Sequence, residues 1–377
     1  MAQCLHCELN PAFIMDIRES YSLKKRNTFG MNVSCACYVE YGSVEELVEF
    51  FSSGRQHGLP LPFLHIGGGS NILFTGDFPG TVFHSGIRFI SEIRPCGTTA
   101  HDADGPGSAA VLVEVGAGTL WDDFCAWCAE RGLWGPENLS GIPGETGAAA
   151  VQNIGAYGVE FKDVVREVRC FDAVTCSIKT FRQQECKYGY RDSIFKQSAK
   201  GRYIVTSVVF GLSTEGGPRL EYGHVKSAVE NALSESSQET LTPSLVRSVI
   251  LGIRDSKLPD PGKTGSAGSF FKNPVVPKIF YEKVEHYAKS KYGQDYEVPH
   301  FDAGSGFVKI PAAWLIDQCG WKGYREGNVG VYEKQPLVLV NLTGKALPGE
   351  IVALEKKIAA SVLNLFGIEL EPEVEHI

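Results

Sequence analysis

The stretch 139–159, LSGIPGETGAAAVQNIGAYGV, has the composition of a loop that binds an anion. It holds five glycines among small and amide-bearing residues, and we expect its side chains to be too small to fill a core. Glycine lacks Cβ, so a ligand can approach its backbone N–H closely. Pro143-Gly144 predicts a turn, and the alanines after it predict a short helix whose first N–H groups could bind a phosphate. The alternative is a tight turn followed by a closely packed helix.

A second glycine-rich loop, GGGSN at 67–71, directly follows the apolar segment Pro62–Ile66. The apolar segment predicts a short buried strand. A strand that runs into glycines is a candidate diphosphate site, and Ser70 and Asn71 would add side-chain donors. The alternative is a hairpin-like turn.

Three side chains outside these loops could act on a bound substrate. Arg191 lies in YGYRD, and its permanently charged guanidinium could hold a carboxylate or a phosphate. The alternative is a surface ion pair with Asp192. Ser269 precedes FFKNP, where aromatic rings could shield its hydroxyl as a donor; the alternative is a turn serine. Glu373 lies in the terminal tail, where the alternative is a solvated carboxylate.

Several familiar motifs fail on inspection. The segment GAG at 116–118 begins like a dinucleotide fingerprint, but Trp121 occupies the place of the third glycine. The segment GKT at 262–264 resembles the end of a phosphate-binding loop, but residue 257 is lysine where a glycine is required. No G-x-S-x-G surrounds Ser269, so a hydrolase triad is not indicated.

The cysteines predict core packing rather than chemistry. Cys125 and Cys128 are expected on one helix beside aromatic residues, as buried thiols. The spacing of Cys4, Cys7 and the cysteines at 35 and 37 is too irregular to favour a zinc site.

The elements that must position these residues can be predicted from apolar periodicity and helix caps. Strands are expected at Cys35–Tyr41, Pro62–Ile66, Thr81–His84, Val111–Val115, Val165–Ala173, Ser177–Phe181, Ile204–Leu212 and Leu337–Asn341. Helices are expected after the capping box of Ser43 and Glu46, after Thr119, from Pro243, at Lys278–Lys291 and at Ala312–Gln318. A last helix has Ile351, Leu354, Ile358, Val362 and Leu365 on one face and ends at Gly367.

This mixture of helices and strands has no strict βαβ alternation, so it predicts an α+β fold. Residues 1–20 carry no clear pattern and are expected to form a loose leader, and the polar stretch 97–109 is expected to be a surface loop.

The bulk composition excludes several classes of protein. A chain of 377 residues suggests two or three domains. A net charge of −8 argues against general nucleic-acid binding, and no apolar run is long enough for a bilayer. The N-terminus is not a secretory signal, and 11 scattered cysteines fit a reducing cytoplasm. We expect a cytoplasmic protein, a monomer, without metal, nucleic-acid or membrane partners.

Taken together, these stretches resemble one family closely. The resembling segments run in family order from about residue 20 to the C-terminus: 27–30, 67–71, 142–144, 152–158, 188–196, 257–261, 268–274, 314–319 and 370–374. The chain is similar to the UDP-N-acetylenolpyruvoylglucosamine reductases, also called UDP-N-acetylmuramate dehydrogenases. The segments YGYRDSIFK and SFFKNP are similar to the subgroup that keeps a tyrosine-bearing loop over the substrate.

The resemblance implies a flavoenzyme of bacterial peptidoglycan precursor synthesis. Two α+β subdomains of the PCMH-type flavin-binding fold, at 20–90 and at 91–235 with the tail 368–377, would hold FAD. A third domain at 240–366 would bind the sugar nucleotide. NADPH would reduce the flavin, which would then transfer hydride to the enolpyruvyl double bond of UDP-N-acetylglucosamine enolpyruvate and so give UDP-N-acetylmuramate.

The resemblance also implies site residues. Arg191 would stabilise negative charge beside the substrate carboxylate, with Glu373 near the same group, and Ser269 would deliver the proton. Tyr190, Tyr222, Lys257 and Asn273 match positions that contact the substrate. The residues expected to bind FAD are Gly67, Gly68, Gly69, Ser70, Asn71, Ser140, Gly141, Ile142, Pro143, Gly144, Gly147, Ala148, Asn153, Gly155, Ala156 and Gly158.

Two other readings stay open at this point. An FAD-dependent oxidase of a sugar or hydroxy acid would share the flavin-binding architecture, and His65 is a candidate position for a covalent flavin tether. A binding module without chemistry is the third reading, but the presence of Arg191, Ser269 and Glu373 together argues against it.

Overall fold

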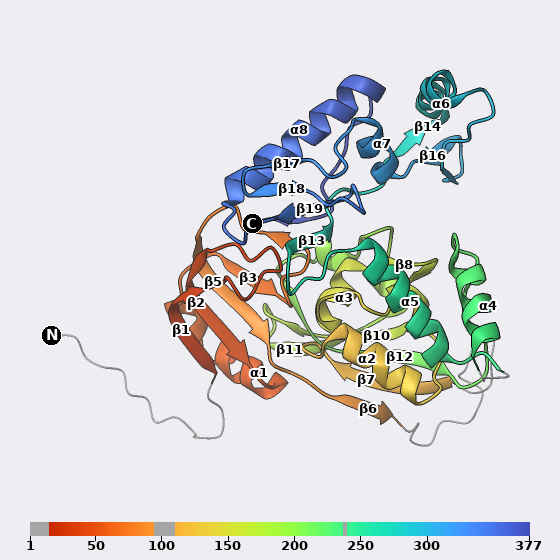
Figure 1. The fold of residues 1–377 in the computed structure, drawn as a ribbon. Helices are drawn as coiled ribbons and strands as arrows, with labels where there is room; N and C mark the ends of the chain where they lie inside the picture. The colour runs from red at the N-terminus through yellow and green to blue at the C-terminus, as the bar shows by residue number, and fades with distance from the viewer. Residues whose placement is uncertain (1–14, 94–109, 237–239) are drawn as a thin grey trace. The chain divides into compact units, whose positions relative to one another are not determined.

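The computed structural model describes residues 15–93, 110–236 and 240–377. Contacts divide the chain into two compact units (Figure 1). Unit 1 contains the described residues of 15–21, Cys35–Gly68 and Pro79–Gly252, and unit 2 contains Ser22–Ser34, Gly69–Phe78 and Ile253–Ile377. The predicted loop at 97–109 and the cysteines at 4 and 7 lie outside the described residues.

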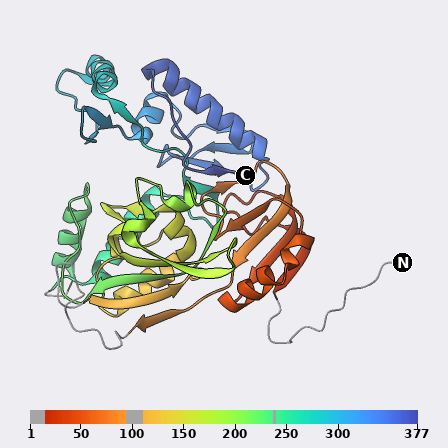
Figure 2. The ribbon, with the colours of Figure 1, turned by 180° about the vertical axis from the view of Figure 1, so that it is seen from behind.

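The first sheet of unit 1 has the strand order β1-β2-β5-β3. These strands are β1 (Asp16–Ser22), β2 (Ser34–Tyr41), β5 (Phe78–Ser85) and β3 (Phe63–Ile66). The helix α1 (Val44–Ser52) buries Leu47 and Phe50 in the core that Phe83 of β5 shares. The predicted cap is present, because Ser43 Oγ accepts a hydrogen bond from Glu46 N at 3.2 Å. The strands and the helix are seen from behind in Figure 2.

The second sheet of unit 1 is antiparallel, with the order β11-β10-β12-β7-β6. Its strands are β6 (Ile90–Ile93), β7 (Ala110–Gly116), β10 (Val165–Asp172), β11 (Ser177–Arg182) and β12 (Tyr203–Ser213). Between β7 and β10 the chain forms η2 (Glu137–Leu139), β8 (Gly155–Ala156) and β9 (Val159–Glu160), and after β12 it forms the helices α4 (Val225–Glu235) and α5 (Pro243–Lys257).

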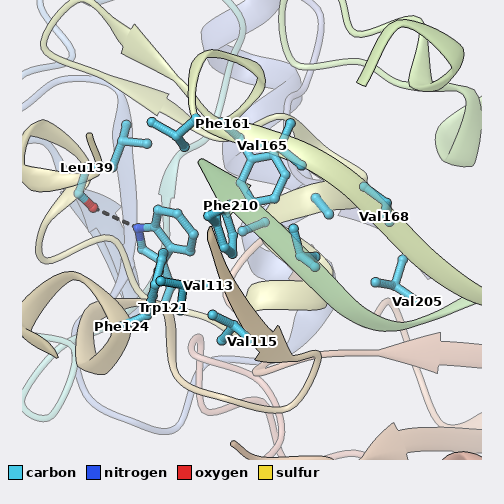
Figure 3. Packing of buried hydrophobic residues seen from close by; sticks show 14 of the residues in the cluster. Val113, Val115, Trp121, Phe124, Leu139, Phe161, Val165, Val168, Val205 and Phe210 are labelled. Carbon is cyan, nitrogen blue, oxygen red and sulfur yellow. Dashed lines mark hydrogen bonds between the residues drawn. The ribbon is translucent and has the colours of Figure 1, made fainter. Parts of the chain in front are cut away.

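An aromatic core packs on this second sheet (Figure 3). It is formed by Trp121 and Phe124 of α2 (Trp121–Glu130) together with Phe161 and Phe210, with ring centroids 4.5 to 5.9 Å apart. The indole Nε1 of Trp121 donates a hydrogen bond to Leu139 O at 2.9 Å. This bond attaches the aromatic core to the start of the glycine-rich stretch 139–159.

Unit 2 contains two main sheets and three helices. The strand orders are β13-β19-β18-β17 and β14-β16-β15. Their strands are β13 (Gly265–Ser269), β14 (Val275–Pro277), β15 (Phe301–Asp302), β16 (Phe307–Lys309), β17 (Arg325–Glu326), β18 (Val329–Val331) and β19 (Val338–Asn341). The helices are α6 (Lys278–Tyr292), α7 (Ala312–Gln318) and α8 (Pro348–Phe366), of which α8 packs on β18 and β19 (Figure 1). The tail strand β20 (Glu375–His376) pairs in parallel with β4 (Ile72–Leu73).

The sequence-based expectations about the fold fail at four places. The strand expected to be buried at Pro62–Ile66 is largely exposed, and of β3 only Ile66 is buried. Residues 16–22 form β1 rather than a loose leader. On α8, Leu365 is 43% exposed, and the neighbouring Phe366 is buried in its place. The stretch 139–159 does contribute to a core, because Leu139 and the alanines at 149 and 150 are buried in the aromatic cluster.

The α+β mixture predicted from the sequence is present in the structure. Among the described residues, no helix combines the length and apolar character that crossing a bilayer would require. The division into two flavin subdomains and a substrate domain describes ligand-binding roles and stays a prediction.

Candidate active site

The two glycine-rich stretches contact each other within unit 1. A Cβ placed on Gly67 would lie 2.9 Å from the Cβ of Ala148, and one on Gly68 would lie 3.3 Å from the Cα of Gly144. Side chains at 67 and 68 would therefore force the two segments apart. Gly69 belongs to unit 2, where its φ is +66° and a Cβ would lie 2.0 Å from Arg26 O. Packing against neighbouring atoms therefore favours glycine at 67 and 68 and requires it at 69, whatever ligand binds there.

The start of α3 (Thr146–Gln152) is less available to an anion than the sequence suggested. Thr146 N donates to Thr119 O and Gly147 N donates to Ala117 O, each at 2.9 Å. The expectation that the first amides of this helix are unpaired is wrong for these two residues. A ligand at this turn must be bound chiefly by groups other than the backbone amides of Thr146 and Gly147.

A partly exposed ion pair supports this turn. The carboxylate of Asp122 accepts a hydrogen bond from Gly141 N at 2.5 Å. It also pairs with the guanidinium of Arg247 on α5, at 2.5 and 2.8 Å. Sequence reasoning missed both side chains, because they are 125 residues apart and neither lies in a recognisable motif. Asp122 and Arg247 therefore position the turn that contains the predicted cofactor residues 140–144.

Unsatisfied buried atoms at this turn fit a bound FAD. The hydroxyl of Ser140 is fully buried and has no hydrogen-bond partner among the described residues. Asn138 donates to Tyr157 O and Arg219 O, but its buried Oδ1 has no partner in the described part of the chain. A buried polar atom without a partner is costly, so a ligand that bonds to it would stabilise the fold.

Asn153 has a structural role that its sequence context did not reveal. It caps α3 in the left-handed conformation at φ 46°. Its Nδ2 donates to Gly189 O at 2.7 Å and to Glu160 Oε2 at 3.1 Å, and its Oδ1 accepts from Lys162 N at 3.0 Å. The side chain thus joins the QNIGAYG segment to the loop that precedes Arg191.

Arg191 lies against the QNIGAYG segment in unit 1. Its Nη2 donates to Gly155 O at 2.8 Å, and its backbone φ is +54°. The next helical turn supports this conformation, because Lys196 Nζ bonds to Gln152 Oε1 at 3.0 Å and to Arg191 O at 3.3 Å. A left-handed arginine is an uncommon and strained conformation, of the kind that occurs at functional sites.

Ser269 and Glu373 are brought close together in unit 2. Ser269 ends β13, where the pairing with β19 is irregular between Ser266 and Ser269. The next residue, Phe270, accepts a hydrogen bond from Glu373 N at 2.8 Å through its carbonyl. Asn71 then donates to Glu373 O at 3.1 Å. Asn71 and Phe270 thus both bond to the backbone of Glu373, which places that backbone beside the residue that follows Ser269.

The four predicted substrate-contacting residues differ in their surroundings. Asn273 Oδ1 accepts a hydrogen bond from Ala312 N at 2.9 Å, so this side chain caps α7. Tyr190 and Tyr222 are 40% and 46% exposed, which leaves large aromatic surfaces accessible in unit 1. Lys257 is exposed at the end of α5.

His65, the candidate position for a covalent flavin tether, forms a hydrogen bond within the protein. Its Nε2 lies 2.9 Å from the hydroxyl of Tyr41. Elsewhere in the described residues, no group of three or more histidine, cysteine or acidic side chains is arranged to hold a metal.

Comparisons with known proteins identify the family. A domain model described as an FAD-binding domain matches residues 35–176. A model of the C-terminal domain of UDP-N-acetylenolpyruvoylglucosamine reductase matches residues 260–377. The reductase of Bacteroides fragilis is 44% identical over 361 residues, which cover 96% of this chain and 100% of that protein. The chain belongs to the UDP-N-acetylenolpyruvoylglucosamine reductase family.

Other reductases of this family show the same full-length match. The protein of Porphyromonas gingivalis is 40% identical over 96% of this chain and 100% of its own length. The crystal structure of the Thermus caldophilus reductase covers 96% of this chain and 99% of that one, with a TM-score of 0.61 at 23% identity, and so supports the fold. The predictions of an FAD-binding α+β fold and of a flavoprotein oxidoreductase of this family are confirmed.

Proposed function

We propose that this protein reduces UDP-N-acetylglucosamine enolpyruvate to UDP-N-acetylmuramate during peptidoglycan precursor synthesis, with FAD as cofactor and NADPH as hydride donor. The supporting observation is the 44% identity to a reductase of that name over its entire length. We place the enzyme in the cytoplasm, where the cysteines of the described residues stay free thiols. The family relationship favours this reaction over that of a sugar or hydroxy-acid oxidase.

FAD, when bound, would supply the hydride that reduces the enol ether at its terminal carbon. Negative charge then develops on the neighbouring carbon and on its carboxylate. We assign the stabilisation of this charge to Arg191, because an oriented cation binds the transition state better than the ground state. The bond from Nη2 to Gly155 O orients its guanidinium. Ser140, Gly68 and Gly144, with the other residues expected at 67–71 and 140–158, would hold the cofactor.

Proton delivery is assigned to Ser269. Serine is a weak acid, so it can act only when it is partly desolvated and held close to the carbon that receives the proton. Ser269 is half-buried at the end of a strand, between Gly268 and the buried ring of Phe270. Glu373, held by its backbone bonds to Phe270 and Asn71, would act at the same substrate group.

The family resemblance assigns four residues to substrate binding. Tyr190 of the YGYRDSIFK segment is exposed, as expected for the subgroup with a tyrosine-bearing substrate loop. Tyr222 packs edge-on against Tyr157, with ring centroids 6.1 Å apart. We assign these two tyrosines, Lys257 and Asn273 to substrate binding, and expect Lys257 and Tyr222 at the nucleotide diphosphate.

The Ser269→Ala variant tests the assignment of the proton donor. NADPH should reduce its flavin at a nearly normal rate, because that half-reaction needs no proton from Ser269. Reoxidation by the enolpyruvyl substrate should slow by ~100-fold or more, the upper range of general-acid effects. Stopped-flow absorbance of the flavin measures both steps.

A matched control is Ser266→Ala, at a buried position of the same strand that pairs with Val340 of β19. It should leave both half-reactions close to those of the unaltered enzyme. Equal losses in the two half-reactions of Ser269→Ala would contradict the assigned role.

A further inference from the structure

His84 is a buried histidine with a carboxylate at each ring nitrogen. Its Nδ1 lies 2.9 Å from Glu40 Oε2, and its Nε2 lies 2.9 Å from Glu145 Oε1. The side chain of His84 is fully buried, and that of Glu145 is only 5% exposed. None of the three residues takes part in the reaction proposed above, so their burial calls for another explanation.

Both ring nitrogens of His84 are placed to donate to a carboxylate. A neutral imidazole has one N–H donor, and an ionised carboxylate can only accept. For both ring nitrogens to donate to ionised carboxylates, each nitrogen must carry a proton. That is one proton more than a neutral imidazole has. An imidazole that donates to both carboxylates carries a positive charge, which offsets one of the two negative charges around it.

His84 and Glu145 lie beside the two glycine-rich loops. His84 on β5 pairs with Ile66 on β3, the residue directly before Gly67. Glu145 directly follows Gly144 in the other glycine-rich stretch. A Cβ on Gly67 would lie 3.4 Å from Glu145 Oε2. The Glu145 carboxylate therefore lies against the first glycine loop while it belongs to the second.

A carboxylate at that place would repel a diphosphate strongly, because charges interact more strongly away from water. The Glu145 carboxylate forms an ion pair with His84 when the imidazole is protonated. Tyr38, whose ring lies 6.2 Å from that of His84 and whose hydroxyl lies 3.0 Å from Glu40 Oε2, brings no positive charge, and the cation of Arg18 acts on Glu40.

We infer that His84 is a positioning residue for the cofactor: it neutralises and holds Glu145, and so allows the glycine loops to accept the diphosphate of FAD. This inference depends on the proposed placement of FAD at these loops. It does not depend on the assignments of Arg191, Ser269 or Glu373.

The test compares FAD dissociation constants of four proteins by flavin fluorescence: the unaltered protein, His84→Gln, and two double variants. His84→Gln removes the imidazole whose positive charge offsets a carboxylate. FAD binding should therefore weaken at least about tenfold. Adding Glu145→Gln removes the carboxylate at the loop and should restore the affinity to within about threefold. Adding Glu40→Gln instead gives the same net charge but leaves Glu145, so affinity should stay low.

Comparing the two double variants distinguishes an effect of the Glu145 charge on FAD binding from a general loss of structure. Both variants carry two substitutions in the same buried group, and only one of them removes Glu145. The single variant Glu145→Gln provides an independent check if His84→Gln does not fold. It should bind FAD as tightly as the unaltered protein or more tightly.

Wild-type affinity in His84→Gln, equally weak binding in both double variants, or a tenfold loss in Glu145→Gln would each overturn the inference. If the unaltered protein bound no FAD, the proposed function itself would fail, so the two failures are distinguishable.

Discussion

Replacing Gly67 with alanine should test the contact between the two glycine loops directly. The new Cβ would lie 2.9 Å from the Cβ of Ala148, closer than carbon atoms pack in proteins. Overpacking of this size costs about 1–3 kcal/mol, so we expect the free energy of unfolding to fall by about 2 kcal/mol. The variant Ala148→Gly removes the clashing atom and by itself should cost about 1 kcal/mol through lost helix propensity.

The two changes should not be additive. In the double variant, the nearest remaining contact of the new Cβ is Glu145 Oε2 at 3.4 Å, which is close to ordinary packing. We therefore expect the double variant to lose about 1 kcal/mol rather than about 3, a coupling of about 2 kcal/mol. Urea unfolding of the FAD-free proteins measures these values, and an FAD titration should show the same recovery in affinity.

Gly58→Ala is the matched control, because its Cβ would have no neighbour within 4 Å and its φ is not in the left-handed region. It should be neutral or slightly stabilising, by up to about 1 kcal/mol, through the unfolded state. Strictly additive losses for the changes at 67 and 148 would show that the two loops do not touch as described.

Two further predictions concern titrating groups in unit 1. Hydrogen bonds from Arg202 lower the pKa of Asp172 to about 2, so its stabilising effect is complete above pH ~4 and is lost as the pH falls towards 2. Asp172→Asn should thus lower the urea midpoint at pH 7, and the difference should vanish near pH 2; a constant difference would refute this. Burial raises the pKa of Cys125 and of Cys128, so iodoacetamide at pH 8 should modify neither thiol before unfolding, as mass spectrometry of peptides can verify.

Local patterns in the sequence were sufficient for most elements of the fold. The cap at Ser43 and the left-handed Gly367 that ends α8 are short-range signals, and both are present. The strand β1 was missed because its side chains are almost all exposed, so it has no apolar alternation to detect. The strand β20 was missed because its two residues pair with β4, about 300 positions earlier in the chain.

The candidate site was predictable where residue type alone carries the information. Glycines mark the two loops, because no other residue permits the approach of 67 to 148. The partners of the backbone amides could not be predicted, since Gly147 N bonds to a carbonyl 30 residues away. For the same reason, no pattern indicated the pairing of His84 with Glu145, which joins side chains 61 positions apart.

The composition of unit 2 has a consequence for synthesis on the ribosome. Its segments 22–34 and 69–78 carry the buried side chains of Phe29 and Phe74, but most of the unit comes from residues 253–377. Asn341 even donates a hydrogen bond to Phe29 O, 312 positions earlier. The buried residues of these early segments therefore lack their packing partners from 253–377 until nearly the whole chain has been translated. During that interval their apolar side chains are exposed and can aggregate. We expect a nascent-chain chaperone to bind preferentially at these segments.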